Sequence, residues 1–315
     1  VVAYRGACLM SILPIDHGIF ASSGGVAGAP GAGYFGGGEV TSDVTTVDRF
    51  LFADDSRTTL GTGLSSAVDD LAGMASSVAG YFGGGKETYS NTATVNRFLF
   101  ADDSRTTLST GLSSARRAPG AMASSVAGYF GGGYATDYVS TVDRFLFSDD
   151  SRTTLGTGLS GNRYYLAGMA SSVAGYFVAG YQGGSGRVST IDRFLFSNDS
   201  RTTLGTGMSY NTSALAAMAS PIAGYAGSGD DQTEINRFLF SNDSRTILSA
   251  ELSVAGEEMA AMASSLAGYF GGGWGGGSRH DTVDRFLFAD DSKTTLSTGL
   301  SAATRKLAGM ANLGA

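Results

Sequence analysis

Short apolar segments alternate with glycine-rich and polar segments along the chain, and this pattern returns at a nearly fixed interval. The tetrapeptide RFLF occurs six times, and the steps between successive copies are 48, 47, 49, 44 and 48 residues. A period of this length is typical of a protein built from repeated structural units. The copies begin at Arg49, Arg97, Arg144, Arg193, Arg237 and Arg285.

Each repeat contains four short segments with the character of strands. LAGMASS is followed by VAGYFGGG, then by TVDRFLF, and after ADDSR by TTLGTGLS. Glycine triplets and the tripeptides DDS or NDS separate the segments, and Asp, Asn and Ser oxygens favour tight turns because they hydrogen-bond the nearby backbone. No segment has apolar residues every three to four positions over eleven residues, as a helix would. The repeat therefore predicts four antiparallel strands.

The third segment indicates how the repeats pack. Strand side chains alternate between faces, so Phe50 and Phe52 point one way while Val47 and Leu51 point the other. A strand that is apolar on both faces needs cover on both, which the neighbouring blades of a β-propeller supply. The rungs of a β-solenoid, the competing repeat fold, are much shorter than this repeat. We therefore expect a β-propeller.

The segment count predicts six blades. Each of the four segments occurs six times, but the last LAGMA-type copy, Leu307–Ala311, stands at the C-terminus, and the GYFGGG that should follow it is found at Gly33–Gly38. We expect the C-terminal strand to complete the first blade and to close the ring, which removes its open edges. The prediction is an all-β, six-bladed propeller of four-stranded antiparallel blades over residues 31–315, with seven blades as the alternative. Residues 1–30 are then an N-terminal arm or linker.

Composition excludes several classes of function. The formal net charge is −7 and there is no basic cluster, which argues against a nucleic-acid partner. No run of about 18 apolar residues is present, so we expect no membrane span. The single cysteine, Cys8, rules out an internal disulfide framework.

The repeat resembles the kelch repeat, in which a hydrophobic strand ending in a double glycine precedes an aromatic strand. Gly83–Gly84 and Phe98 correspond to these features in the second copy. The tryptophan usual in the fourth kelch strand is absent, and Leu60 and Leu108 stand near its place. The unit is more similar to the GYFxGG and VDRF propeller repeats of phage tail fibres and environmental bacterial surface proteins. This resemblance covers residues 33–315 and implies a binding or scaffolding module, located on a virion, on a cell surface or outside the cell.

Sequence differences between the copies concentrate in one set of loops. The chain reverses at every strand, so the loops after the first and third strands share one face of the disc, and the loop after the second strand shares the other face with the link to the next blade. The nearly invariant SS and DDSRTT turns belong to the first face, which we call the constant face. Segments that differ between copies, such as KETYSNTA, YQGGSGRVS and GNRYY, belong to the second, which we call the variable face.

The variable face also gathers side chains that often anchor binding surfaces. Tyr, Trp and Arg bury much area and keep a polar group, and a sugar ring stacked on an aromatic ring with Asn or Asp hydrogen bonds would suit these loops. The alternative is that these loops vary in sequence because they have no functional role. The candidate binding residues are Tyr89, Tyr134, Tyr138, Asn162, Arg163, Tyr164, Tyr165, Tyr181, Arg187, Tyr210, Asp231, Trp274 and Arg279.

The recurring Asp–Arg pairs and the acidic turns predict a structural role. An arginine on a strand flanked by blades needs a carboxylate or carbonyl partner, since an unpaired buried guanidinium is costly. We expect that partner in the turn of the same or the neighbouring blade. Two carboxylates in a turn fall short of the six to eight oxygens that calcium takes. The structural residues are Arg49, Arg97, Arg144, Arg193, Arg237 and Arg285, with Asp55, Asp103, Asp150, Asp199, Asp243 and Asp291.

No arrangement in the sequence indicates catalysis. His17 and His280, the two histidines, have no spacing that would make a metal pair. We expect no catalytic residue, no metal and no cofactor. The leading hypothesis is a non-enzymatic adhesion or binding module with a protein or glycan ligand on the variable face. The alternatives are a structural subunit of an extracellular fibre, sheath or filament, in which residues 1–30 would contact other subunits of a homo-oligomer or larger assembly, and an enzyme acting on polysaccharide.

Overall fold

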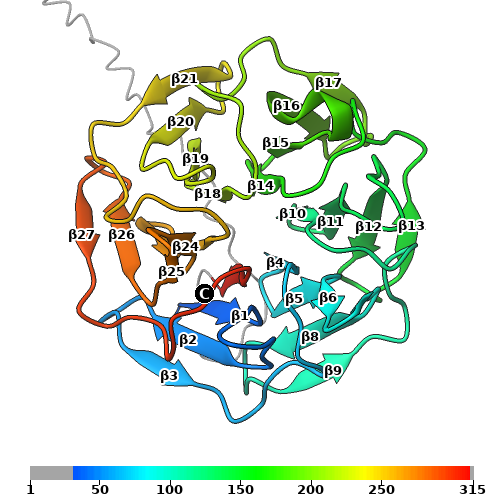
Figure 1. Ribbon diagram of the computed structural model, residues 1–315. Helices are drawn as coiled ribbons and strands as arrows, with labels where there is room; N and C mark the ends of the chain where they lie inside the picture. The colour runs from blue at the N-terminus through cyan, green and yellow to red at the C-terminus, as the bar shows by residue number, and fades with distance from the viewer. Residues whose placement is uncertain (1–30, 313–315) are drawn as a thin grey trace, which may run out of the picture.

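The computed structural model describes residues 31–312, which form six four-stranded antiparallel sheets around a central axis (Figure 1). The predicted all-β, six-bladed propeller is confirmed, and the seven-bladed alternative is wrong. The helical part of the described chain is a single 3-10 turn, η1 (Gly183–Ser185). Residues 1–30, which include Cys8 and His17, lie outside the described residues.

Strands are called first to fourth from the axis outward. The first strands are β28 (Ala308–Asn312), β4 (Ala72–Ala75), β10 (Gly120–Ala123), β14 (Ala167–Ala170), β18 (Ala216–Ala219) and β22 (Ala260–Ala263) in blades 1 to 6. The second strands are β1 (Ala32–Gly36), β5 (Ala79–Gly83), β11 (Ala127–Gly131), β15 (Ala174–Tyr181), β19 (Ala223–Gly227) and β23 (Ala267–Gly271). Both sets come from the LAGMA and GYFGGG segments of the repeat.

The outer strands follow the same order. The third strands are β2 (Val47–Leu51), β8 (Val95–Leu99), β12 (Val142–Leu146), β16 (Arg187–Leu195), β20 (Ile235–Leu239) and β26 (Val283–Leu287). The fourth strands are β3 (Arg57–Thr59), β9 (Arg105–Thr107), β13 (Arg152–Thr154), β17 (Arg201–Thr203), β21 (Ser244–Ile247) and β27 (Lys293–Thr295). Two small hairpins, β6 (Lys86–Glu87) with β7 (Ser90–Asn91) and β24 (Trp274–Gly275) with β25 (Ser278–Arg279), stand in the loops after second strands.

The fourth strand is shorter than the predicted TTLGTGLS segment. In blade 1 the chain turns inward after β3, and Leu64 is buried. At the equivalent end of blade 6, the backbone N–H and the hydroxyl of Ser301 donate to Asp48 Oδ2 of blade 1 at 2.7 and 2.8 Å. The GLS end of the segment therefore belongs to the interface between blades and not to the sheet.

The C-terminal strand closes the ring, as predicted. β28 pairs antiparallel with β1, with Met310 opposite Tyr34 and Gly309 opposite Phe35. Blade 1 thus combines strands from both ends of the described chain, and its innermost strand is held to the blade by strand pairing and packing.

Methionine and glycine fit together where blades meet. Each first-strand methionine packs on the second-strand glycine of the next blade: a Cβ added at Gly80 would lie 2.0 Å from Met310 Sδ, and one at Gly128 would lie 2.1 Å from Met74 Sδ. Any side chain at these positions would collide with the neighbouring blade. The contact explains why GYF and GMA or AMA recur together in the repeat.

A tyrosine, an aspartate and an arginine also link neighbouring blades at the constant face. Arg49 forms an ion pair with Asp103 of the next blade, and the Tyr34 hydroxyl donates to Asp103 Oδ1 at 2.9 Å. The same pairing joins all six interfaces. The ion pairs are Arg49–Asp103, Arg97–Asp150, Arg144–Asp199, Arg193–Asp243, Arg237–Asp291 and Arg285–Asp55.

The first acidic residue of each turn acts locally. Asp54 Oδ1 accepts the Ser56 N–H at 3.0 Å, and Asn198 Oδ1 accepts the Ser200 N–H at the same distance. An amide oxygen serves as well as a carboxylate here, which is why Asn replaces Asp in two copies. Among residues 31–312, no three His, Cys, Asp or Glu side chains are placed to hold a metal ion.

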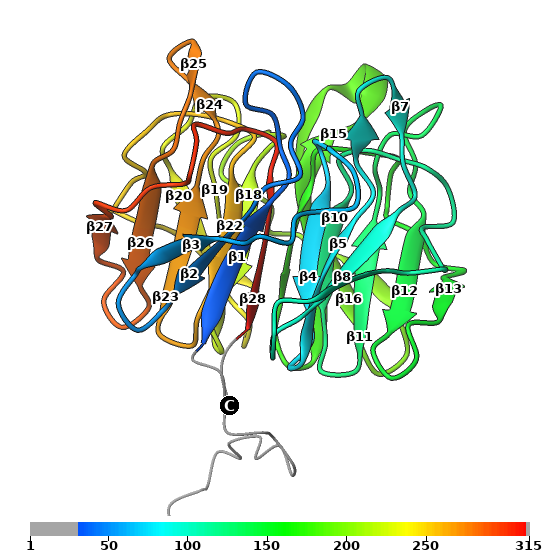
Figure 2. The same ribbon diagram turned by 90° about the horizontal axis from the view of Figure 1, so that it is seen from below.

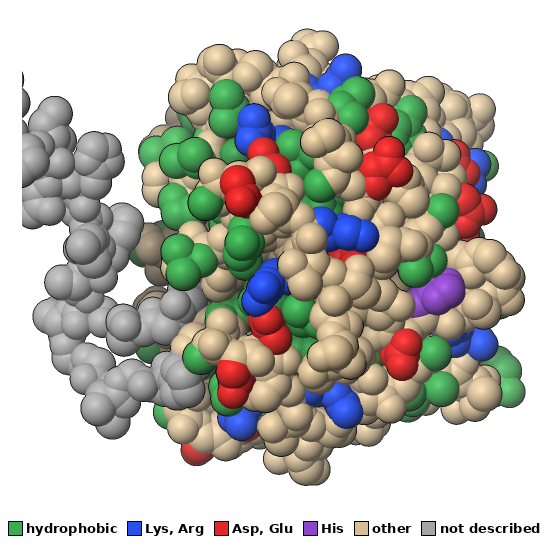
Figure 3. Space-filling view, turned by 90° about the vertical axis from the view of Figure 1, so that its left-hand side faces the viewer, with side chains coloured by type: hydrophobic (Ala, Val, Ile, Leu, Met, Phe, Trp, Pro, Cys, Tyr) green, Lys and Arg blue, Asp and Glu red, His purple; other side chains and the backbone are tan. Residues whose placement is uncertain are grey.

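The two faces of the disc differ in the structure as in the sequence. Both small hairpins lie at the upper end in Figure 2, which is the variable face, and β1 begins and β28 ends at the opposite, constant face. The turns between first and second strands carry one exposed aliphatic side chain each in blades 2 to 6, and hydrophobic side chains gather on the left-hand side of Figure 3. These exposed residues are Val78, Val126, Val173, Ile222 and Leu266.

Candidate functional site

Six equivalent residues surround the axis on the variable face, each just before a first strand. All have left-handed backbone angles, with φ between 49° and 60°. The N–H of each donates to the carbonyl of its equivalent in the preceding blade at 2.7 to 3.0 Å, so six hydrogen bonds form a closed circle. The circle brings together side chains that are far apart in the sequence. These residues are Asp70, Ala118, Tyr165, Ala214, Glu258 and Lys306.

A cavity of about 70 Å³ opens inside this circle, and we call it the axial mouth. Its lining consists of the six residues of the circle and the apolar residue that follows each of them. A cavity of this volume has room for a few water molecules or one small chemical group. The apolar residues are Leu71, Pro119, Leu166, Leu215, Met259 and Leu307.

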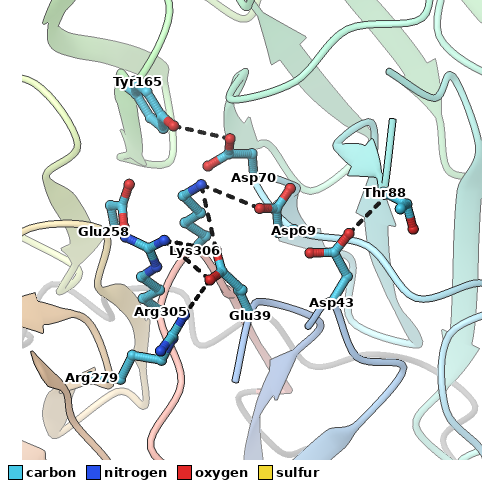
Figure 4. A network of polar contacts seen from close by, with 10 residues as sticks. All are labelled: Glu39, Asp43, Asp69, Asp70, Thr88, Tyr165, Glu258, Arg279, Arg305 and Lys306. Atoms are coloured by element: carbon cyan, nitrogen blue, oxygen red, sulfur yellow. Dashed lines mark hydrogen bonds and ion pairs between the residues drawn. The ribbon is translucent and has the colours of Figure 1, made fainter. Parts of the chain in front are cut away.

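Lys306 lies at the centre of a polar network around the axial mouth (Figure 4). Its Nζ lies 3.3 Å from Asp69 Oδ2 and 3.7 Å from Glu39 Oε2. Arg305 pairs with the same Glu39 at 2.9 Å and approaches Glu258 Oε2 at 3.3 Å. The cations of the network are therefore directed largely toward Glu39 and Asp69.

Asp70 is less well neutralised than these carboxylates. Its side chain is buried, with 5% of the residue exposed, and Tyr165 donates its hydroxyl to Oδ2 at 3.0 Å, but Oδ1 has no hydrogen-bond donor. Burial raises the pKa of Asp70 to about 6, the charge of Lys306 opposes this rise, and the charge of Asp69 adds to it.

Glu258 is also incompletely neutralised by its neighbours. Burial raises its pKa to about 7, Lys306 and Arg305 oppose the rise, and Asp70 and Glu257 add to it. The Oε2 atom has the nearby Arg305 charge but no hydrogen bond. Two carboxyl groups thus line the axial mouth with unused acceptor atoms. Perturbed carboxyl groups in a cavity are typical of functional sites.

Five predicted tyrosines form one cluster beside the axial mouth, which we call the tyrosine patch. The ring of Tyr164 is at its centre, with centroids 4.5 Å from Tyr165, 5.2 Å from Tyr138, 5.8 Å from Tyr181 and 5.9 Å from Tyr134. They come from the β11–β12 loop, the link into β14 and the end of β15. Tyr165 belongs both to the patch and to the axial mouth.

Trp274 and Arg279 lie in a different group. Two guanidinium groups lie near the Trp274 ring, with the Arg305 Cζ 4.8 Å and the Arg279 Cζ 5.6 Å from its centroid. Arg279 also pairs with Glu39. This group, on β24, β25 and the link into β28, joins the polar network of the axial mouth.

The remaining predicted residues are dispersed on the variable face. Tyr89 is 96% exposed at the tip of the β6–β7 hairpin, and Asn162 and Asp231 are exposed in loops. Arg187 forms an ion pair with Asp230 at 2.9 Å, and the Tyr210 hydroxyl donates to the Ser228 carbonyl at 3.3 Å. None of these side chains contributes a ring contact to the tyrosine patch among the described residues.

Arg163 does not offer a surface group, in contrast to the expectation. Its side chain is fully buried and its Nη2 lies 2.7 Å from Asp192 Oδ2. The equivalent position is buried in other blades as well, where it holds Val68, Thr212 and Thr304. The preceding loop turns this position inward whatever residue occupies it. Arg163 therefore stabilises the junction of the link with blade 4.

Sequence reasoning missed the charged residues of the axial mouth. Asp70, Glu258, Lys306 and Glu39 were absent from the candidate set. One signal was available: the second position before each first strand varies as Asp, Ala, Tyr, Ala, Glu and Lys, and an apolar residue follows it in every copy. That six such positions meet at one point follows only from the closed ring.

In comparisons with known proteins, no protein-family model matches the chain and no curated sequence is significantly similar to it. Within residues 31–312, no helix combines the length and the apolar character needed to cross a bilayer.

Proposed function

We propose that the protein is a non-enzymatic binding module whose variable face takes a glycan. The observation that supports this proposal is the tyrosine patch, four rings in contact with the central Tyr164 ring, beside a cavity with unused hydrogen-bond acceptors. Tyrosine faces stack on sugar rings, and carboxylate oxygens accept hydrogen bonds from sugar donors. A protein ligand is the alternative. A location on a virion or a cell surface, as the repeat resemblance implies, belongs to the same proposal.

A glycan array followed by calorimetry tests the proposal. Tyr164→Ala removes the central ring of the patch, and we expect at least a tenfold loss of affinity for any oligosaccharide found on the array, about 1.4 kcal/mol. Tyr89→Ala, at the predicted residue that lies on the exposed hairpin outside the patch, is the comparison variant, and a loss of affinity equal to that of Tyr164→Ala would place the ligand away from the patch. Equal binding by the wild type and Tyr164→Ala would contradict a role for the patch.

The raised pKa values of two carboxyl groups are a reason to test whether the protein is an enzyme acting on polysaccharide. Glu258 and Asp70 line the same cavity and titrate near neutrality, which a general acid or base requires. Incubation of the array ligand with the wild type and with Glu258→Gln, followed by a reducing-end assay, distinguishes the classes. Release of reducing ends by the wild type alone would replace the binding role by catalysis.

The constant face favours a second role, as a subunit of a larger assembly. Five exposed aliphatic side chains on one face form the kind of surface that marks interaction sites. Size-exclusion chromatography with light scattering across a concentration series measures this directly. A monomer at every concentration would argue against assembly through this face.

A further inference from the structure

Two buried carboxylate oxygens at the axial mouth accept no hydrogen bond. Asp70 Oδ1 and Glu258 Oε2 both belong to residues that line the cavity, both are buried, and neither receives a hydrogen bond. A buried carboxylate oxygen without a donor is costly, so such atoms are normally satisfied by protein, water or ligand. The donors nearest to them are engaged elsewhere: Tyr165 with Asp70 Oδ2 and Lys306 with Asp69 and Glu39. Arg305 forms an ion pair with Glu258 Oε2 at 3.3 Å without a hydrogen bond, and its Nη2 pairs with Glu39.

The charges around the axial mouth are not balanced. Glu39, Asp69, Asp70 and Glu258 carry four negative charges when ionised, whereas Arg279, Arg305 and Lys306 carry three positive charges. Four further charged groups act on the site from outside this set, Arg117 on Asp70, Glu257 on Glu258, and Asp43 and Lys86 on Asp69, and their charges cancel. When all four carboxyl groups are ionised, an excess negative charge therefore remains in a site that is largely out of water, and either a proton or a bound cation neutralises it.

We propose that the axial mouth binds the primary ammonium group of an amino sugar, with the ammonium donating to Asp70 Oδ1 and Glu258 Oε2. This inference rests on the proposed glycan-binding function and names its ligand class. An ammonium is compact and has three donors, which suits a cavity of about 70 Å³ with Ala118 and Ala214 on its circle. The sugar ring that carries the ammonium would meet the tyrosine patch through Tyr165.

The pH dependence of binding follows from the same groups. In the free protein, protons compete with the ligand for the two carboxyl groups, whose pKa values lie at about 6 for Asp70 and about 7 for Glu258. Affinity should therefore fall as the pH drops from 7 to 5, and it should fall again at alkaline pH, where the amine of the ligand loses its proton. Binding at pH 6.5 should release protons, and calorimetry in two buffers of different ionisation enthalpy measures that release.

The experiment compares oligomers of glucosamine, N-acetylglucosamine and glucose by calorimetry. We expect the free amine to bind at least tenfold more tightly than the other two, since acetylation removes the charge and two donors. Asp70→Asn and Glu258→Gln should each abolish this preference, whereas Asp281→Asn, which removes an exposed charge from a loop of the same face, should retain it. Near-ultraviolet circular dichroism of each variant establishes that the fold is intact.

The outcomes separate this inference from the proposed function. Equal affinity for amine and N-acetyl forms, or a preference unchanged in both carboxyl variants, would overturn the ammonium site while glycan binding stands. If no oligosaccharide binds, a titration with methylammonium tests the axial mouth. Binding is then monitored by the NMR chemical shifts of Tyr165 and Ala118. If KCl competes with the ligand and choline chloride at equal ionic strength does not, the site binds an inorganic cation. That result would also overturn the inference.

Discussion

At the scale of single residues, two positions that depart from the repeat are explained by their contact with each other. In most blades a glycine after the YF dipeptide lies against the phenylalanine of the next blade: a Cβ on Gly36 would lie 2.7 Å from the Phe82 ring. Blade 4 has Val178 in the glycine position, and blade 5 has Ala226 in the phenylalanine position. Both residues are fully buried in one core cluster. At this interface the larger side chain belongs to blade 4 and the smaller one to blade 5, which reverses the arrangement at Gly36 and Phe82.

This exchange leads to a test by double-mutant cycle. Val178→Gly should leave a cavity beside Ala226 and cost about 1 to 3 kcal/mol, and Ala226→Phe should overpack the interface by a similar amount. The double variant restores the pair found at Gly36 and Phe82 and should be less destabilised than the sum of the two. Chemical denaturation measures all four proteins. Additive effects would show that the two positions do not compensate each other.

The aspartate of the constant-face contact gives a second test at this scale. Asp103→Asn keeps a residue that tolerates the left-handed φ of 56° but weakens the acceptor for Arg49 and Tyr34. We expect a loss of about 1 to 3 kcal/mol in the free energy of unfolding. Asp102→Asn is the matched control, because Asn already occupies that turn position at Asn198 and Asn242. A denaturation midpoint equally lowered in both variants would refute a special role for the interblade pair.

At the scale of elements, much of the fold could be predicted because the repeat encodes each strand locally. The apolar positions on both faces of VDRFLF imply a neighbour on each side, and β2 is indeed covered on both. The fourth strand was overestimated since the partner of Ser301, Asp48, comes from another blade and leaves no local signal. For the same reason Arg163 was placed on the surface: its sequence neighbours are loop residues, but its partner Asp192 is not.

The closing strand is the element whose loss should matter most. Deletion of residues 307–315 removes β28, and the edge of β1 would then expose unpaired N–H and C=O groups. We expect a lower thermal midpoint and aggregation detected by light scattering, because an open edge pairs readily with another chain. Deletion of residues 313–315 alone, which spares β28, is the control. A truncated protein with the wild-type midpoint would argue against the closing role.

At the scale of the whole molecule, the ring produces a site that no single repeat contains. Asp70, Tyr165, Glu258 and Lys306 come from blades 2, 4, 6 and 1 and become neighbours only because the hydrogen-bonded circle closes. The constant parts of the repeat make equal interfaces, and the varying positions at the axis give the closed ring one asymmetric centre. The sequence therefore predicted the face of the candidate site from the variable loops but not its centre.

The constant face carries the last prediction, which concerns the molecule as a unit of assembly. Replacing Val126, Val173, Ile222 and Leu266 by Ser removes most of the exposed aliphatic surface at turns that point into solvent. Because these side chains bury little in the monomer, the thermal midpoint at low concentration should be unchanged. If the face joins molecules, light scattering should show the wild type forming larger species with rising concentration and the variant remaining a monomer. Association of the variant equal to that of the wild type would show that any assembly uses another surface.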